Sequence, residues 1–423
     1  MDTQEVNVTE KEEKIGYRDI FKQTEYMKII ISNVIGRFGD SIDSIAFTWL
    51  VYAVTGSAAW SAIIFALNQL PTVLLQPFAG VMVEKMNKKR VMVISDLVRG
   101  CVIVLLVWLY ATNNINPLVL ALFTLIISSV EAFCLPASIA LIPKVIDMKY
   151  YAFGTSVNST FSNVAQLIGL GIVGVIINVG GIEAAMLIDG VTFFLSAVLT
   201  GLVKYKEEKQ KGNSVVENGY FKELKDGINY IKVKKVILNF CILAVIMNAV
   251  TVPINSLQSP MVVEIFGLGS ELLSVFGVTL IIGMTLGTLV LPYIIGKVPV
   301  RAMVIVSGVF ISIGYGALVL GKFTYGKVIP SLLLCGGISL VLGAAISLIS
   351  GAVQIQFMNS VEEEYLARAA SIFNASASAA SPIMSMIVSA LAVKLSVGTI
   401  FLGAAICMLI VFMIIAISKM QME

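Results

Sequence analysis

Long apolar stretches separated by short polar turns make up most of the chain. Twelve of them are long enough to cross a bilayer as a helix, which takes about 20 residues. They lie near residues 27–53, 58–83, 90–111, 117–142, 152–178, 183–203, 236–263, 271–296, 300–321, 328–356, 367–394 and 397–418. The pattern predicts an all-α membrane protein with twelve transmembrane helices.

A polar segment at residues 204–235 divides the twelve stretches into two sets of six. Within it, Phe221, Leu224, Ile228 and Ile231 recur at helical spacing, with charged residues between them, which predicts an amphipathic helix at the membrane surface. The expected parts are an N-terminal segment (1–26), a six-helix bundle (27–203), the linker (204–235), a second six-helix bundle (236–418) and a tail (419–423).

Composition supports a polytopic membrane protein. The chain is 58% hydrophobic and 13% charged, whereas soluble domains are about 45–50% apolar and about 25% charged. The net charge of +3 is too small to indicate nucleic-acid binding. There is no histidine, so we expect carboxylates to carry any proton chemistry. We expect no metal or other cofactor, and the scattered cysteines are expected to be buried free thiols.

Lysine and arginine are concentrated in alternate loops. They follow the second, fourth and eighth stretches, and the linker has nine lysines, whereas the loops TGSA and TNNINP have none. Exceptions are Lys322, Lys327 and Lys394. This distribution predicts that both termini and the linker are cytoplasmic. The N-terminal segment lacks an apolar core and a cleavage site, so we expect no signal peptide.

The segment GVMVEKMNKKRV at residues 80–91 is similar to the signature between spans two and three of the major facilitator superfamily. Gly80 matches, Glu84 and Lys85 stand for its Asp-Arg pair, and Asn87 replaces its second glycine. The basic cluster is Lys88, Lys89 and Arg90. Asparagine tolerates the left-handed backbone that a glycine often marks.

Further segments resemble the macrolide-efflux-like branch of this superfamily, which also includes siderophore exporters. They are GDSIDSIAFTWLVYAVTGSA, SDLVRG, LPASIALIPKVI, LIDGVTFFLSA and QIQFMNSVEEEYLARAASIFN. The resemblance implies the major facilitator fold, with two six-helix bundles around one central site that opens to each side in turn. In span five, Leu170 stands where the proton-antiporter signature has proline, so proton antiport is a hypothesis.

Charges inside the first and fourth stretches are candidates for proton coupling. Asp40 and Asp43 share a helix face, and Glu131 is isolated in an apolar run. A carboxylate at the bilayer centre costs roughly 2.5–3.5 kcal/mol on insertion scales, so such groups usually border water or a partner. The alternatives are a structural Arg37–Asp40 pair and a Glu131 that only joins two helices.

Charges near the basic loop are candidates for a cytoplasmic gate, a charge network that holds one conformation. The residues assigned to it are Gly80, Glu84, Lys85, Lys88, Lys89, Arg90, Asp96 and Arg99. Asp189, near the outer end of the sixth stretch, is expected to be structural.

Polar side chains near Pro253 are candidates for a substrate cavity. Asn248, Thr251 and Asn255 share one face of the seventh stretch, where they either line a cavity or join helices. The remaining cavity candidates are Arg37, Phe47 and Phe373.

The expected function is secondary active export of amphipathic small molecules, such as a macrolide-type antibiotic. We expect alternating access driven by protons or another ion, in the lipid of a bacterial cell membrane, by a monomer. No Walker A motif is present, so ATP is not the direct energy source. Alternatives are export of a siderophore, lipid or metabolite, and a non-transporting sensor or assembly partner. No catalytic constellation occurs, so we do not expect an enzyme.

Overall fold

The computed structural model describes residues 20–146, 148–205, 229–362 and 365–418, and helices account for nearly all of them. The elements are α2 (Thr24–Thr55), α3 (Ala58–Lys85), α4 (Lys88–Ala111), α5 (Pro117–Val145), α6 (Met148–Gly201), α8 (Lys235–Ser256), α9 (Gln258–Met261), η1 (Val262–Phe266), α10 (Ser270–Ile294), α11 (Val300–Leu318), η2 (Val319–Thr324), α12 (Val328–Ser360), α13 (Leu366–Ala392) and α14 (Val397–Ile417). The all-helical class is therefore confirmed.

Short polar residues begin several of these helices. The side chains of Ser57, Asn87, Asn116 and Ser396 each accept a hydrogen bond from the backbone N–H three residues later, which satisfies a donor that the helix itself leaves free. At the end of α2, Gly56 adopts a left-handed conformation with φ of 58°, which glycine allows without a steric penalty. These residues fix the turns between apolar stretches.

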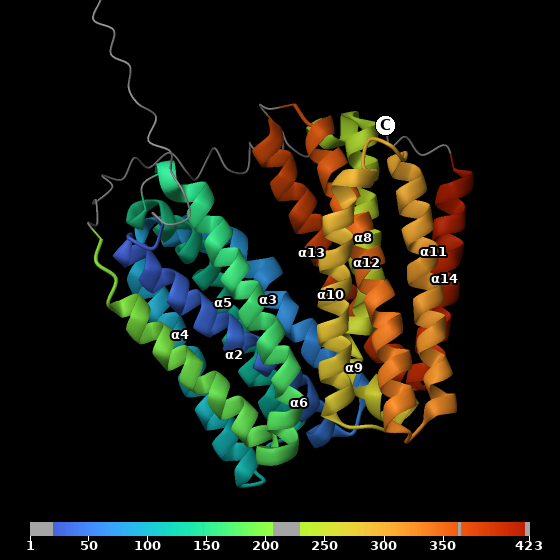
Figure 1. The fold of residues 1–423 in the computed structure, drawn as a ribbon, viewed down its shortest axis with the longest axis horizontal. Helices are drawn as coiled ribbons and strands as arrows, with labels where there is room; N and C mark the ends of the chain where they lie inside the picture. Colours follow the sequence, from blue (N-terminus) through green and yellow to red (C-terminus); the bar gives the residue numbers. More distant parts are fainter. Residues whose placement is uncertain (1–19, 147, 206–228, 363–364, 419–423) are drawn as a thin grey trace, which may run out of the picture.

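Helix α6 contains two of the expected stretches. A straight helix of its 54 residues would be about 80 Å long, whereas the hydrocarbon core is about 30 Å thick. The backbone leaves helical geometry at Gly181, with φ of 78° and ψ of 175°, and the chain then runs back beside itself (Figure 1). We call residues 148–180 the first arm of α6 and residues 182–201 the second arm.

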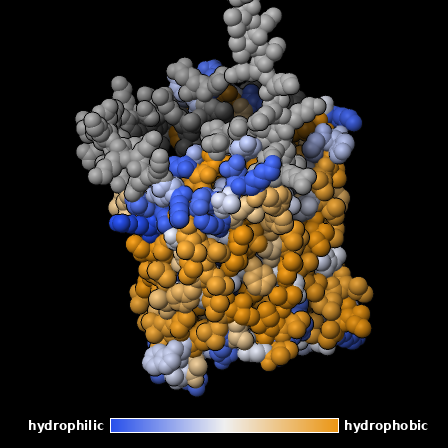
Figure 2. All heavy atoms as spheres, turned by 60° about the vertical axis from the view of Figure 1, so that its left-hand side comes forward, coloured by the Kyte–Doolittle hydropathy of each residue, from blue (hydrophilic) through white to orange (hydrophobic). Residues whose placement is uncertain are grey.

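An apolar band lies between two polar ends on the face of the molecule shown in Figure 2. Ten of the described helices are long and apolar enough to cross a membrane, with α6 counted once. Helix α2 is not among them, because Arg37, Asp40 and Asp43 lower its hydropathy. The protein is a multi-pass membrane protein.

Small residues bring neighbouring helices close together. A Cβ atom on Gly39 of α2 would lie 1.9 Å from Thr192 Oγ1 of the second arm, and one on Gly169 of the first arm would lie 2.0 Å from Ser41 Oγ. Helix α2 therefore packs tightly against both arms of α6. Helices α10 and α12 approach equally closely at Gly283 and Gly343, as small residues allow in membrane proteins.

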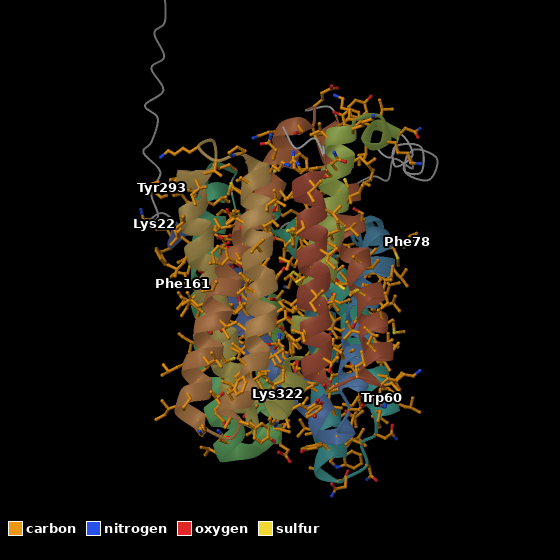
Figure 3. All side chains as sticks on the ribbon, turned by 90° about the vertical axis from the view of Figure 1, so that its right-hand side faces the viewer. Lys22, Trp60, Phe78, Phe161, Tyr293 and Lys322 are labelled. Atoms are coloured by element: carbon orange, nitrogen blue, oxygen red, sulfur yellow. The ribbon has the colours of Figure 1, made fainter. Side chains whose placement is uncertain are left out.

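Helices α2–α6 and α8–α14 form the two sides of the molecule in Figure 1, apart at the end near the C terminus and close at the opposite end. Trp60 and Lys322 mark this opposite end in Figure 3, which we call the contact end. Hydrogen bonds between described residues join the two sides at three places. They are Tyr52 Oη to Glu264 Oε1 at 3.2 Å, Gly174 N to Ser274 Oγ at 2.9 Å, and Ser385 Oγ to Ala62 O at 2.6 Å.

The expected linker helix lies mostly outside the described residues, including Phe221, Leu224 and Ile228. Residues 229–233 are helical, and Ile231 is buried. The Tyr230 ring stacks on Tyr365 with centroids 4.2 Å apart, which holds the end of the linker against the segment between α12 and α13.

All five cysteines are free thiols, but only two of them are fully buried. Cys241 and Cys335 lie in the core and Cys134 is half-buried, as an apolar thiol usually is. Cys101 on α4 and Cys407 on α14 are exposed, which corrects the expectation that every thiol is buried. A position in an apolar run does not distinguish the core from the outer surface of a membrane protein.

Candidate functional site

A central cavity of about 550 Å³ lies between the two sides of the molecule. Helices α2, α3, α4, α5, the first arm of α6, α8, α9 and α10 all contribute to its wall. Seven of the predicted residues line it: Arg37, Asp40, Asp43, Phe47, Glu131 and Asn255 from the coupling and cavity sets, and Arg99 from the gate set. The structure therefore brings the predicted acids of the first and fourth stretches into one chamber.

Arg99 pairs with Asp40 across the cavity wall. Its Nη2 atom lies 2.9 Å from Asp40 Oδ1, and its guanidinium carbon lies 4.0 Å from the centroid of the Phe193 ring. Arg99 is eleven residues into α4, which places it about 17 Å along the helix from Lys88. The predictions that Arg99 joins the gate near the basic loop and that Arg37 pairs with Asp40 are therefore corrected.

Asp43 and Glu131 are the remaining acids of the cavity. Among the described residues, Asp43 Oδ1 is buried and has no hydrogen-bond partner. With Asp40 held by Arg99, two carboxylates remain against one guanidinium, that of Arg37. A wall with an excess of negative charge in a low-dielectric setting attracts cations.

Five amide side chains also line the cavity, and sequence reasoning assigned only one of them. They are Asn68, Gln69, Gln166, Asn255 and Gln258. Each amide provides both donors and acceptors, so the wall can hydrogen-bond a polar ligand from several helices. The available signal was the presence of amides inside otherwise apolar runs, as in NQLP and NVAQL.

A smaller cavity of about 240 Å³ adjoins the central one and shares Asn255 and Leu280 with it. Asn248 and Thr251 line it together with apolar residues, so the predicted polar face of α8 does border a cavity. The Asn248 amide also donates to Ala244 O at 3.0 Å, and the Thr251 hydroxyl donates to Asn248 O at 2.9 Å. This cavity offers a mainly apolar surface beside the polar chamber.

Phe373 does not line either of these cavities. Its ring stacks on Phe357 with centroids 4.3 Å apart and an interplanar angle of 30°. This pair of rings accounts for the position of Phe373 by helix packing, and its contact with substrate stays a prediction.

The described residues of the basic loop between α3 and α4 make local contacts, and the charge network that also needs Glu84 and Lys85 stays a prediction. The Lys89 ammonium donates to Val203 O at 2.9 Å, and Arg90 N donates to Asn87 Oδ1 at 2.9 Å. Lys88 is buried and Gly80 has open space beside it. The side chains of Glu84 and Lys85 lie outside the described part. Asn87 has φ of −70°, so it serves as a helix cap and the expected left-handed backbone is corrected.

Asp96 takes part in a buried hydroxyl cluster. Ser196 Oγ donates to Asp96 Oδ2 at 2.6 Å, and Ser32 Oγ lies 2.8 Å from Ser196 Oγ and 2.9 Å from Thr200 Oγ1. These contacts join α2, α4 and the second arm of α6. A satisfied polar cluster of this kind holds helices together in a membrane, so its geometry favours a structural role for Asp96.

Comparison with known proteins gives the family. The family model described as Major Facilitator Superfamily matches residues 29–381. "Multidrug efflux pump Tap" of Mycobacterium tuberculosis is 23% identical over 239 residues, 55% of this chain and 57% of that protein. "Macrolide efflux protein A" of Streptococcus pyogenes is 21% identical over 341 residues, 80% of this chain and 81% of that protein.

Another relative, "Uncharacterized MFS-type transporter YkuC" of Bacillus subtilis, is 24% identical over 226 residues, which is 52% of each chain. This chain thus spans about half the length of several curated relatives that it matches. The nucleoside transporter NupG superposes with a TM-score of 0.74 at 13% identity, covering 93% of this chain and 100% of that chain.

A bacterial homologue of the iron transporter ferroportin, solved in an inward-facing state, superposes with a TM-score of 0.69 at 14% identity. The match covers 93% of this chain and 99% of that chain. At such low identity the two solved structures indicate the fold alone. The family predicted from residues 80–91 is confirmed, and the relatives named as efflux pumps support its drug-efflux branch. The chain belongs to the Major Facilitator Superfamily of membrane transporters.

Proposed function

We propose that this protein is a secondary active exporter of amphipathic small molecules that carry a protonated amine, such as a macrolide-type antibiotic. The observation that carries the proposal is the central cavity, whose wall holds Asp43 and Glu131 beside the Arg99–Asp40 pair. The names of two relatives, a multidrug efflux pump and a macrolide efflux protein, support the same direction and substrate class.

The proposed architecture has twelve crossings in two bundles of six. The count takes the ten candidate helices, with α6 crossing twice around Gly181, and adds α2. The charges of α2 face the cavity or a partner there, which makes its crossing tolerable. The lysine-rich loops support cytoplasmic termini and a cytoplasmic linker.

The proposed transport cycle is alternating access. Tyr52, Gly174 and Ser385 all bond across the two sides toward the contact end. Under the proposed orientation, the contact end faces outward. The described conformation is then closed outward, and rocking of the two bundles would break these bonds and open the cavity to the other side.

The cavity chemistry supports a cationic amphiphile as substrate. A protonated amine would pair with Asp43 or Glu131, the amides would bond polar groups, and the smaller cavity would take an apolar part. A proton and the amine then compete for the same carboxylates. Binding of one displaces the other from the cavity carboxylate, which couples export to the proton gradient.

The test is transport by purified protein in liposomes with an imposed proton gradient. We expect gradient-dependent movement of a radiolabelled macrolide or a cationic dye, abolished by a protonophore. Asp43→Asn should remove the dependence on the gradient while the protein stays folded. Glu183→Gln removes an acid outside the cavity wall and is the matched control.

Two results would contradict the proposal. One is normal gradient-driven transport by Asp43→Asn. The other is no movement of any compound in a panel of macrolides, cationic dyes, siderophores and lipids, which would favour a non-transporting membrane protein of the same fold.

A further inference from the structure

Asp189 in the second arm of α6 is a buried acid that the proposed transport cycle has not used. Its side chain is fully buried, and neither carboxylate oxygen has a hydrogen-bond partner among the described residues. The neighbouring Thr192 hydroxyl instead donates to the backbone carbonyl of Asp189 at 2.7 Å. A buried carboxylate without donors is costly when charged, so a proton on Asp189 would remove this cost.

Asp189 lies against α2 close to Asp43. A Cβ atom on Gly39 would be 2.6 Å from Asp189 Oδ1, so this oxygen occupies space that a larger residue in α2 would fill. Asp43 is one helical turn beyond Gly39 and on the same face. Its Oδ1 is also buried and has no partner within the described ranges. The two unpartnered carboxylates therefore face one region behind the cavity wall.

The charges around this region do not balance. Asp189 is repelled by Asp43 and Asp40 and attracted by Arg99. Asp43 is repelled by Asp40 and Glu131 and attracted by Arg99. Arg99 already donates to Asp40, and Arg37 is exposed on the cavity side. Asp96 also lies near Arg99, so five carboxylates share two guanidiniums. The excess falls on Asp43 and Asp189, which accept no hydrogen bond from the described residues.

Two carboxylates that share one site do not both ionise readily, because each raises the cost of charging the other. A single proton removes this cost and supplies the donor that the oxygens lack. We propose that Asp43 and Asp189 form one proton-binding pair, in which Asp189 holds or returns the proton that Asp43 exchanges with the cavity. The role of this pair in transport rests on the proposed export function.

The pair has one member at the cavity and one behind it. Asp43 lines the chamber, whereas Asp189 is eight residues beyond the Gly181 reversal, about 12 Å along the second arm. When an amine occupies Asp43, the proton moves from the Asp43 carboxyl oxygen to an Asp189 carboxylate oxygen. One O–H bond breaks and another forms, and the negative charge moves to Asp43, where it pairs with the amine.

The test is an infrared pH titration of the purified full-length protein in lipid nanodiscs, with isotope-labelled aspartate and without substrate. We expect a band of a protonated, buried carboxylic acid that persists at neutral pH in the wild type. Asp189→Asn should bind one proton fewer and change the titration midpoint of the remaining acid by about one pH unit or more, since coupled sites titrate as a pair. Glu183→Gln should leave the band unchanged.

A second variant keeps the proposal testable if Asp189→Asn fails to fold. Asp43→Asn leaves Asp189 in place and should change the midpoint of the Asp189 band by a similar amount. An unchanged titration in both folded variants would overturn the pair, as would a band that sodium ions displace at constant pH, which would indicate a metal cation as the occupant.

Transport provides the second readout. Asp189→Asn should shift the pH profile of gradient-driven efflux without changing substrate affinity, whereas a purely structural residue would leave the profile of the folded protein unchanged. Because the infrared titration needs no substrate, it can succeed even if the protein exports nothing. Conversely, coupled export without the shared proton would leave the proposed function intact and refute the pair.

Discussion

Tyr52 and Glu264 join the two sides of the molecule at the contact end. The Tyr52 hydroxyl donates to Glu264 Oε1 at 3.2 Å, and Oε2 of the same carboxylate accepts from Val397 N at 3.4 Å. One side chain of η1 therefore holds both the end of α2 and the beginning of α14. This carboxylate is placed to stabilise the conformation in which this end is closed.

Removing the hydroxyl should favour opening of the contact end. Tyr52→Phe loses one hydrogen bond, worth about 1 kcal/mol, which changes the ratio of closed to open states about five-fold. Hydrogen–deuterium exchange of peptides covering residues 52–60 and 393–399 should accelerate by about this factor, since exchange follows the open population. Tyr293→Phe, at an exposed position near the other end, is the control. Equal exchange in the two variants would refute the closing role.

Substitutions of Arg99 should separate the contribution of its charge to stability from the contribution of its planar shape. Arg99→Gln leaves Asp40 without its cation, and we expect a loss somewhat below the about 3–5 kcal/mol of a fully buried pair, because the Asp40 side chain is 36% exposed. Arg99→Lys keeps the charge but loses the planar contact with Phe193. Its stability should therefore lie between those of the wild type and Arg99→Gln. Thermal unfolding in detergent measures both.

A double variant tests whether this cost comes from the uncompensated carboxylate. Adding Asp40→Asn to Arg99→Gln should recover part of the lost stability, because no unpaired charge remains. A double variant that is less stable than Arg99→Gln by the full cost of Asp40→Asn would show that the two residues are independent.

Helices α10 and α12 are closest at Gly283, where we expect no larger side chain to be tolerated. A Cβ atom on Gly283 would lie 2.0 Å from the Leu340 carbonyl oxygen, and this backbone atom moves only if the helices separate. Gly283→Ala should therefore lower stability by about 1–3 kcal/mol or more. Gly337→Ala in α12 meets nothing within 4 Å and should be neutral or stabilising by up to about 1 kcal/mol. Similar melting temperatures for the two variants would contradict this packing.

Glu25 should make a pH-dependent contribution to stability outside the membrane. Its carboxylate accepts from Lys204 N at 2.6 Å and from Lys28 Nζ at 2.7 Å. The backbone N–H of Lys204, followed by Lys28, holds the pKa of Glu25 below its ordinary value of 4.5. A lowered pKa in the folded state contributes stability above the unfolded value, and this contribution is lost as pH falls through the folded value.

Glu25→Gln should therefore be less stable than the wild type at neutral pH. The difference should shrink as pH falls below 4.5 and disappear once pH is below the lowered pKa of folded Glu25. Melting curves of the two proteins across this range measure the difference. Glu183→Gln, an acid without these two donors, should show no such convergence. A constant difference between wild type and Glu25→Gln at every pH would contradict the role of the ionised carboxylate.

The membrane class, the family and the chamber acids were predictable because they depend on local signals. Apolar length predicted the helices, and an acid inside an apolar run, such as Asp43 or Glu131, indicated a wet cavity. The loop motif with Gly80 and its basic cluster indicated the family, although Glu84 and Asn87 depart from its pattern. These signals need no knowledge of which helices pack together.

The partners of these groups were not predictable in the same way. Arg99 was assigned to its nearest charges along the chain, whereas the fold pairs it with Asp40, 59 residues away. Nothing in the stretch around Asp189 shows that its carboxylate lies against Gly39 of α2. The contact between Phe373 and Phe357 is likewise set by helix packing and not by a local signal in the sequence. Several side chains lie at a similar depth in the membrane, and helix packing determines which of them become neighbours. This packing cannot be deduced from a single sequence.

The exposed thiols of Cys101 and Cys407 lie on α4 and α14, in opposite halves of the chain. Cys241 and Cys335 are shielded in the core, so replacing Cys134 alone would leave one exposed thiol on each half. Donor and acceptor dyes attached there would report the separation of the halves by energy transfer in single molecules. The native chain thus already contains two thiols at which the distance between the halves can be followed as the protein opens.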